Sequence, residues 1–233
     1  MAIYNDTGIN SEQSLESRYN NKAQERELYL ERARDCSELT IPTLIPQDGA
    51  TMAEEFETTY QGIGARGVNN LASKLLLSLL PPNAPFFRLA IDNFAVQEIE
   101  EDENLRTQID SGLVKIEKAV MDDIEMSNDR VAVFEALKHL IVGGNALLFV
   151  SKEGLRVFPL SQYVLERDPM GNVLEIITKE SIAYNALPED IRQAILSQQG
   201  EKKESDVCDL YTCVKRKPDH FMVHQEVKGI KLE

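Results

Sequence analysis

A single apolar helix between residues 61 and 82 constrains the fold of this chain more than any other stretch. Its last ten positions before the prolines hold six leucines, and the apolar residues recur every three to four positions: Leu71, Leu75 and Leu79, with Ala72, Leu76 and Leu80 one step round. Pro81 and Pro82 lack the N–H that a helix needs, so the helix should end near Leu80. The run is too short for a membrane span of about 20 apolar residues. We therefore predict a helix of the protein core.

The start of the same stretch admits two interpretations. The residues from Gly62 to Gly67 fit the dinucleotide fingerprint G-x-G-x-x-G, which binds pyrophosphate when a buried strand leads into it and a helix follows. Residues 53–60 hold no apolar strand run, and the acidic Asp92 follows only after the double proline. We favour the second interpretation, in which the glycines have a steric role: they carry no side chain and so let a helix begin close against another backbone. A nucleotide-binding enzyme that uses the turn from Gly62 to Gly67 is kept as the alternative.

The charge balance narrows the classes of function. The 233 residues carry 25 basic and 39 acidic side chains, which gives a net charge of −14. A surface that binds nucleic acid needs clustered Lys and Arg, so the acidic net charge argues against a nucleic-acid-binding surface. Three cysteines, Cys36, Cys208 and Cys213, form no disulfide framework and fit a reducing compartment. The first residues show neither a basic nor an apolar signal region, so we expect no signal peptide and no membrane segment.

The pattern along the chain predicts an α+β fold, with long helices and a small, mainly antiparallel sheet. Residues 1–10 are expected to be disordered, 11–142 to form a helical region, and 143–233 a mainly antiparallel β/α region. Helices are predicted at 11–39, 62–80, 96–126, 129–142 and 188–197, with an extended, proline-marked connection at 40–49 and a polar linker at 198–204. Strands are predicted at 86–91, 146–150, 155–160, 163–167, 173–179, 206–215 and 220–227, the last four as two hairpins.

No pattern for catalysis stands out. Cys208, Cys213, His220 and His224 suggest a zinc site, but the two thiols lie five residues apart on one strand and point to opposite faces. The other candidates are interpreted as structural: His139 as a histidine of the core, and the acids Asp122, Asp123 and Glu125 at a helix end as solvated. We therefore predict no catalytic, cofactor-binding or metal-binding residues, no cofactor, and a protein that is not an enzyme.

Five segments read together are more specific than any single motif. They are TIPTLIP at 40–46, GARGVNNLASKL at 64–75, DRV at 129–131 with FEALK at 134–138, RD at 167–168 with GNVL at 171–174, and ALPEDIR at 186–192. In this order and spacing the chain, from about residue 15 to its end, closely resembles the N-terminal part of the head-to-tail connector, or portal, proteins of short-tailed bacteriophages with double-stranded DNA.

The resemblance implies a ring of twelve subunits at one vertex of the capsid, in the virion and, during assembly, in the host cytoplasm. Such a ring nucleates procapsid assembly with scaffolding protein and major capsid protein. It gives the channel through which terminase packages double-stranded DNA and through which DNA is ejected, and it joins the head to the tail adaptor proteins. The N-terminal part builds much of the outer wing of the ring, and no contact with a membrane is implied.

The chain departs from the family pattern in one large way. It ends before the stem, clip and crown, which leaves open whether it forms the ring alone or is a fragment of a longer product. The residues that contact DNA in the family match no position here, so they stay unknown. From the net charge we hypothesise that acids face the channel and repel DNA, and the cluster from Glu98 to Glu103 is the candidate. The plainer interpretation of this cluster is a solvated face in the first turns of a helix, where negative charge suits the helix dipole.

Overall fold

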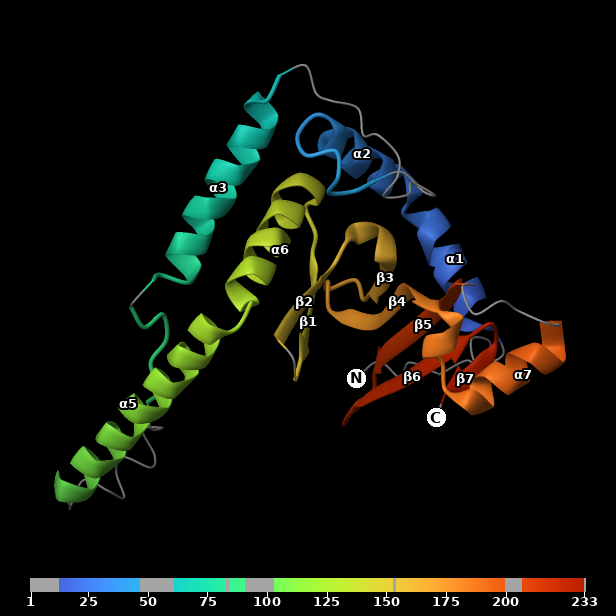
Figure 1. The fold of residues 1–233 in the computed structure, drawn as a ribbon. Coiled ribbons are helices and arrows are strands. Elements are labelled where there is room, and N and C mark those ends of the chain that lie inside the picture. The colour runs from blue at the N-terminus through green and yellow to red at the C-terminus, as the bar shows by residue number, and fades with distance from the viewer. Residues whose placement is uncertain are drawn as a thin grey trace. The chain divides into compact units, whose positions relative to one another are not determined.

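The computed structural model describes residues 13–46, 61–82, 84–90, 103–152, 154–199 and 207–232 (Figure 1). The chain divides into two compact units, one made of Met1–Arg32 with Pro159–Glu233 and the other of Ala33–Phe158. Helices and two antiparallel sheets, of two and five strands, make up the described residues. This confirms the α+β class predicted from the sequence.

The first unit is built on a five-stranded antiparallel sheet whose strands lie in chain order. They are β3 (Tyr163–Arg167), β4 (Val173–Ala183), β5 (Val207–Arg216), β6 (Phe221–Val227) and β7 (Ile230–Leu232). The two predicted hairpins, β3–β4 and β5–β6, are confirmed by their registers. β7 was not predicted. It returns through Lys228 and Gly229, both with positive φ (49° and 80°), which is the two-residue turn that suits the strand twist.

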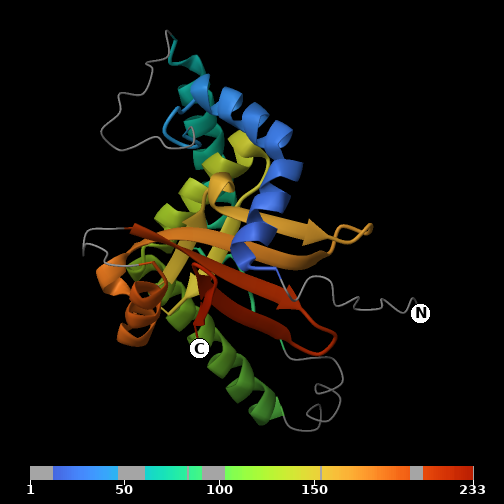
Figure 2. The same cartoon turned by 90° about the vertical axis from the view of Figure 1, so that its right-hand side faces the viewer.

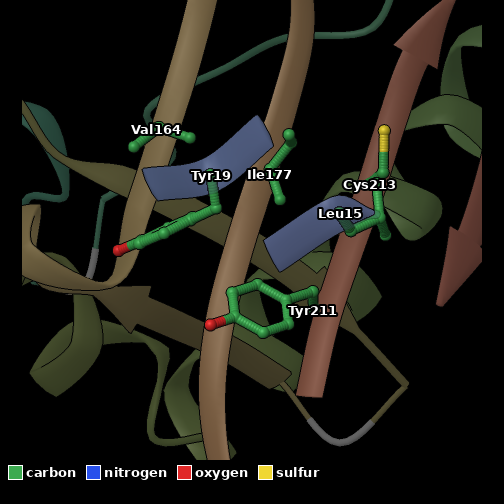
Figure 3. Close-up of a cluster of buried hydrophobic side chains, with 6 residues drawn as sticks. All are labelled: Leu15, Tyr19, Val164, Ile177, Tyr211 and Cys213. Atoms are coloured by element: carbon green, nitrogen blue, oxygen red, sulfur yellow. The ribbon is translucent and has the colours of Figure 1, made fainter. Parts of the chain in front are cut away.

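Helices cover both faces of this sheet. On one face, α1 (Leu15–Glu25) crosses β3, β4 and β5 (Figure 2). The buried cluster beneath it comprises Leu15, Tyr19, Val164, Ile177, Tyr211 and Cys213 (Figure 3). The opposite face holds the second cluster, with Tyr184, Leu187, Ile195, Cys208 and Val227, and Ile195 comes from α7 (Glu189–Gln199). Because side chains alternate along a strand, one strand, β5, supplies both cores.

Two short 3₁₀ helices, η1 (Leu160–Gln162) and η2 (Tyr184–Ala186), join elements of the first unit.

In the second unit, the described residues form the helices α3, α5 and α6, a two-stranded hairpin, and the end of α2 (Glu27–Glu38). α3 (Ile63–Leu79) lies beside α6 (Asp129–Gly143) (Figure 1), and α6 also packs on β2 (Gly154–Phe158), which pairs with β1 (Leu147–Ser151). α5 (Glu103–Met126) leads into α6 through Ser127 and Asn128. Glycine ends α6: Gly144 adopts the left-handed conformation with a φ of 69°.

Three predicted elements differ from the structure. The helix expected at 11–39 is two helices, α1 and α2 (Glu27–Glu38), because the backbone of Arg26 leaves helical geometry. The connection after α2 is not extended, since the N–H of Leu44 donates to the carbonyl of Ile41 in a turn. The strand expected at 86–91 is wrong for residues 86–90. There the N–H of Leu89 donates to Glu117 of α5 at 2.6 Å, so a side chain takes the place of a partner strand.

Some expectations lie outside the described residues. They are the disorder of residues 1–10, the helix before Glu103, the acids at 98–102, and the linker from residue 200. Among the described helices, none has both the length and the apolar composition that a membrane crossing requires.

Candidate functional site

The glycine-rich turn from Gly62 to Gly67 forms the start of α3. A Cβ added to Gly64 would lie 2.5 Å from the carbonyl oxygen of Leu39, a separation too short for any real Cβ contact. Around Gly62 and Gly67 no described atom lies within 4 Å of such a Cβ. The expectation that a glycine brings the helix close to another backbone is therefore confirmed at Gly64. Residues 61 and 62, which lead into α3, form no strand, so nothing in the described geometry favours the nucleotide-binding alternative.

The leucine stripe of α3 is only partly buried, so the prediction of a core helix is wrong for its exposed positions. Val68 and Ala72 are buried, whereas Leu71, Leu77 and Leu79 are 47%, 55% and 53% exposed. The reason is geometric: leucines occupy several sides of the last two turns, and contact with α6 covers one side. Within the described residues, α3 therefore shows a large apolar area to its surroundings.

The exposed side of α3 has a distinct chemistry. We call it the α3 surface, and it consists of Ile63, Arg66, Gly67, Asn70, Leu71 and Lys74, which border a shallow open groove. Arg66 and Lys74 are its charges, and α3 contains no Asp or Glu. Neither cation has an ion-pair partner among the described residues. In a chain of net charge −14, this is a locally cationic and apolar face.

Gly67 sits inside α3 although the described surroundings do not require a glycine there. A glycine in a helix interior costs about 1 kcal/mol relative to alanine, because it loses more backbone entropy on folding. Gly64, three residues earlier, has a steric reason within the chain, and Gly67 has none among the described atoms. A close backbone contact thus explains Gly64, whereas no described contact explains Gly67.

A second exposed face runs along α5 from the middle of the helix to its C-terminal end. We call it the α5 surface, and it consists of Gly112, Ile116, Val120 and Asp123, spaced by three or four residues. Ile116 and Val120 are 52% and 40% exposed, and a Cβ on Gly112 would have no described atom within 4 Å. The last turns also carry Asp122 and Glu125 and no basic residue. Negative charge there is unfavourable, because the C-terminal end of a helix is itself partially negative.

Buried charges join α1 to the sheet in the first unit. Arg18 pairs with Glu175 of β4, and the two side chains are 11% and 3% exposed. Lys22 pairs with Glu166 of β3 at 2.5 Å in a more exposed position, and its hydrogen bond lowers the pKa of Glu166. α1 is thus positioned by charge pairs as well as by its two buried apolar residues.

The N-terminus of α1 is held by a third carboxylate. The N–H of Leu15 donates to both oxygens of Glu226 on β6, at 3.2 and 3.3 Å, and Glu226 is buried. A carboxylate suits the positive end of a helix dipole. The Tyr19 hydroxyl adds a hydrogen bond to the carbonyl of Ser161 at 2.7 Å. These contacts have a structural role, since they fix the helix on the sheet.

The cysteines and histidines of the last hairpin do not converge. Cys208 and Cys213 lie in the clusters on opposite faces of the sheet, as the spacing predicted. His224 pairs with Cys213 across the strands, while His220 lies in the turn before β6. Burial raises the pKa of Cys213 to about 12, and burial lowers the pKa of His224. The described residues contain no group of three side chains able to hold a metal.

The remaining candidates are placed as expected. His139 is 3% exposed within α6, and burial lowers its pKa against the opposing effect of the Glu135 carboxylate. Asp122, Asp123 and Glu125 are exposed at the end of α5.

The comparisons with known proteins identify the family. Residues 12–231 match the family model described as bacteriophage head to tail connecting protein. The match covers nearly the whole sequence, so the chain belongs to this family, in agreement with the resemblance seen in its segments.

Individual relatives carry the name portal protein. That of Escherichia phage T7 is 39% identical over 235 residues, which cover 97% of this chain and 44% of the relative. The portal protein of Enterobacteria phage T3 is 37% identical over 240 residues, which cover 100% of this chain and 44% of the relative. The portal protein of Enterobacteria phage SP6 is 33% identical over 193 residues, which cover 82% of this chain and 37% of the relative. The chain thus spans less than half the length of these curated relatives.

Sequence reasoning missed the two exposed faces as possible sites. For the α3 surface a signal was present, because the polar residues Arg66, Asn70 and Lys74 recur at intervals of four, which places them on one side of the helix. The α5 surface gave a weaker signal, since the valine and isoleucine positions look like any amphipathic stripe. Which side of a stripe stays uncovered depends on the partner elements, and these are set by the tertiary structure.

Proposed function

We propose that this chain is the N-terminal part of a portal subunit, which assembles into a ring of twelve at one vertex of a phage capsid. In this role residues 11–142 and 143–233 contribute to the outer wing. The ring would nucleate procapsid assembly with scaffolding and major capsid proteins, dock terminase, pass double-stranded DNA in both directions, and join the tail adaptor proteins. The site of action would be the virion vertex, after assembly in the host cytoplasm.

The observation that carries this proposal is the family match over residues 12–231. The exposed faces of α3 and α5 support it, because large apolar side chains left outside the core of one chain gain stability when they are buried against another. The role is structural, so we propose no reaction and no cofactor.

The acidic balance supports a channel that does not hold DNA. Lys and Arg bound to phosphates make DNA binding strong, whereas acids repel the polyanion and let it move. We extend this to the cluster from Glu98 to Glu103, whose side chains would face the channel. Neutralising these acids should slow packaging and change its dependence on salt. Packaging that stayed the same in rate and salt dependence would remove this cluster from the proposal.

Electron microscopy and mass photometry test the proposed ring. The full-length product that carries this chain is purified beside the 233-residue chain, and both are examined over a range of concentrations. We expect particles with a central hole and about twelve times the subunit mass for the full-length product. A full-length product that remained a monomer at every concentration, and that bound a nucleotide at the turn after Gly62, would refute the proposal and support the alternative.

A further inference from the structure

Two glycines within helices lie on exposed apolar faces with open space over them. One row of residues in α3, spaced by four, consists of Ile63, Gly67 and Leu71. A row with the same spacing in α5 consists of Gly112, Ile116 and Val120. No described atom lies within 4 Å of a Cβ at either glycine. Rows of residues spaced by four form the ridges that interdigitate when two helices pack, and a glycine in such a row leaves a notch. Each face therefore has the shape that receives another helix.

The charges decide which helix fits. If two α3 surfaces met, Arg66 and Lys74 of each copy would approach the same cations of the other, and like charges across an interface are unfavourable. The occupant must instead bring carboxylates together with apolar side chains. The α5 surface does so. Asp123 lies three residues after Val120, on the same face of α5 as Ile116 and Val120. No described side chain forms an ion pair with it. Cations of α3 would also offset the negative end of α5.

We propose that the α3 surface of one copy of this chain docks on the α5 surface of the next copy. The proposal rests on the proposed function and names the contact by which neighbouring subunits join. The two surfaces are different patches of one chain, so the contact is heterologous. Heterologous contacts close into rings when the rotation between copies allows it. The α3 surface lies away from the buried Val68 and Ala72, so the described part of the chain leaves it exposed for this contact.

A cross-link between copies tests the contact directly. Two versions of the full-length product are made without the exposed Cys36, one with Gly67→Cys and the other with Gly112→Cys, and they are assembled together. Cys208 and Cys213 are buried and stay protected. A disulfide needs Cα atoms within about 7 Å, so under mild oxidation a covalent pair of the two versions is expected. Ser73→Cys, on α3 but outside the α3 surface, is the matched control and should give no pair with Gly112→Cys.

Bulk and charge variants test the energetics of the same contact. Gly67→Leu should weaken self-association at least tenfold, because it fills the notch, while the melting temperature of the dissociated subunit stays equal or rises. The bulk control, Ser73→Leu, should assemble like the wild type. Lys74→Glu and Asp123→Lys should each reduce assembly, and the chain that carries both should recover it.

The outcomes separate this inference from the proposed function. Wild-type rings combined with normal assembly of Gly67→Leu, or with no cross-link between Gly67→Cys and Gly112→Cys, overturn the α3–α5 contact alone. If a later part of the full-length product covers the α3 surface, the cross-link will also be absent, and this result too overturns the α3–α5 contact alone. A wild-type product that never assembles overturns both. Cross-linking in rings, with recovery in the charge exchange, establishes the contact.

Discussion

Replacing Gly64 by alanine should destabilise the protein, although alanine is the better helix former. The added Cβ would lie 2.5 Å from the carbonyl oxygen of Leu39, and 3.1 and 3.3 Å from side-chain and backbone atoms of Thr40. Ordinary contacts begin near 3.4 Å, so α3 and the chain after α2 must separate by several tenths of an ångström. The nearest obstacle is backbone, which cannot rotate away as a side chain can.

The magnitude follows from two opposing contributions. Overpacking a close contact costs about 1–3 kcal/mol. The change from glycine to alanine within a helix returns about 1 kcal/mol. We expect a net loss of about 1–2 kcal/mol for Gly64→Ala, because the contact is with backbone. Gly67→Ala, in the same helix with open space around it, should instead gain about 0.5–1 kcal/mol.

The two variants are compared by urea unfolding, followed by circular dichroism on the dissociated subunit. Their difference isolates the contact with Leu39, since the helix propensity contribution is common to both. For a chain of this size, 1 kcal/mol corresponds to about 2–4 °C in melting temperature. Equal stabilities for the two variants would refute the reasoning. A Gly64→Ala protein of normal stability that had lost binding of a nucleotide would support the alternative function.

Three further predictions concern the buried polar groups. Arg18→Ala should lower the free energy of unfolding by about 3–5 kcal/mol, because it leaves the buried carboxylate of Glu175 unpaired. Lys22→Ala breaks a more exposed ion pair and should cost less than about 1 kcal/mol. Urea titrations of the two variants measure the difference. Burial lowers the pKa of His139, so just below pH 6.5 the unfolded chain takes up a proton at this residue while the folded chain does not. The free energy of unfolding therefore keeps its full value above pH 6.5 and decreases as the pH falls below 6.5. His139→Gln should flatten the stability profile between pH 7 and pH 5, and an unchanged profile would contradict this. A thiol reagent at pH 8 should modify Cys36 rapidly and Cys213 only after unfolding, because Cys213 is buried and its pKa is raised to about 12; rapid labelling of both would show that the sheet face is open.

Local sequence determined the type and order of most elements. The proline pair after Leu80 ended α3, Gly144 ended α6, and the turn between β3 and β4 followed from its proline and glycine. The opposite orientation of Cys208 and Cys213 followed from the two-residue period of a strand. These features depend on backbone geometry within a few residues, so they can be derived without knowledge of distant parts of the chain. The resemblance in five segments likewise needed sequence alone.

The tertiary structure decided which apolar positions became core. The sequence could not tell that Leu71 and Leu79 stay exposed while Val68 and Ala72 are buried, because burial depends on where α6 lies. It could not assign separate purposes to Gly64 and Gly67, since one meets the backbone at Leu39 and the other meets no described atom. Nor could it show that Glu117 would satisfy the N–H of Leu89 in place of a strand. Each of these outcomes is set by residues distant in sequence, whose positions only the folded chain fixes.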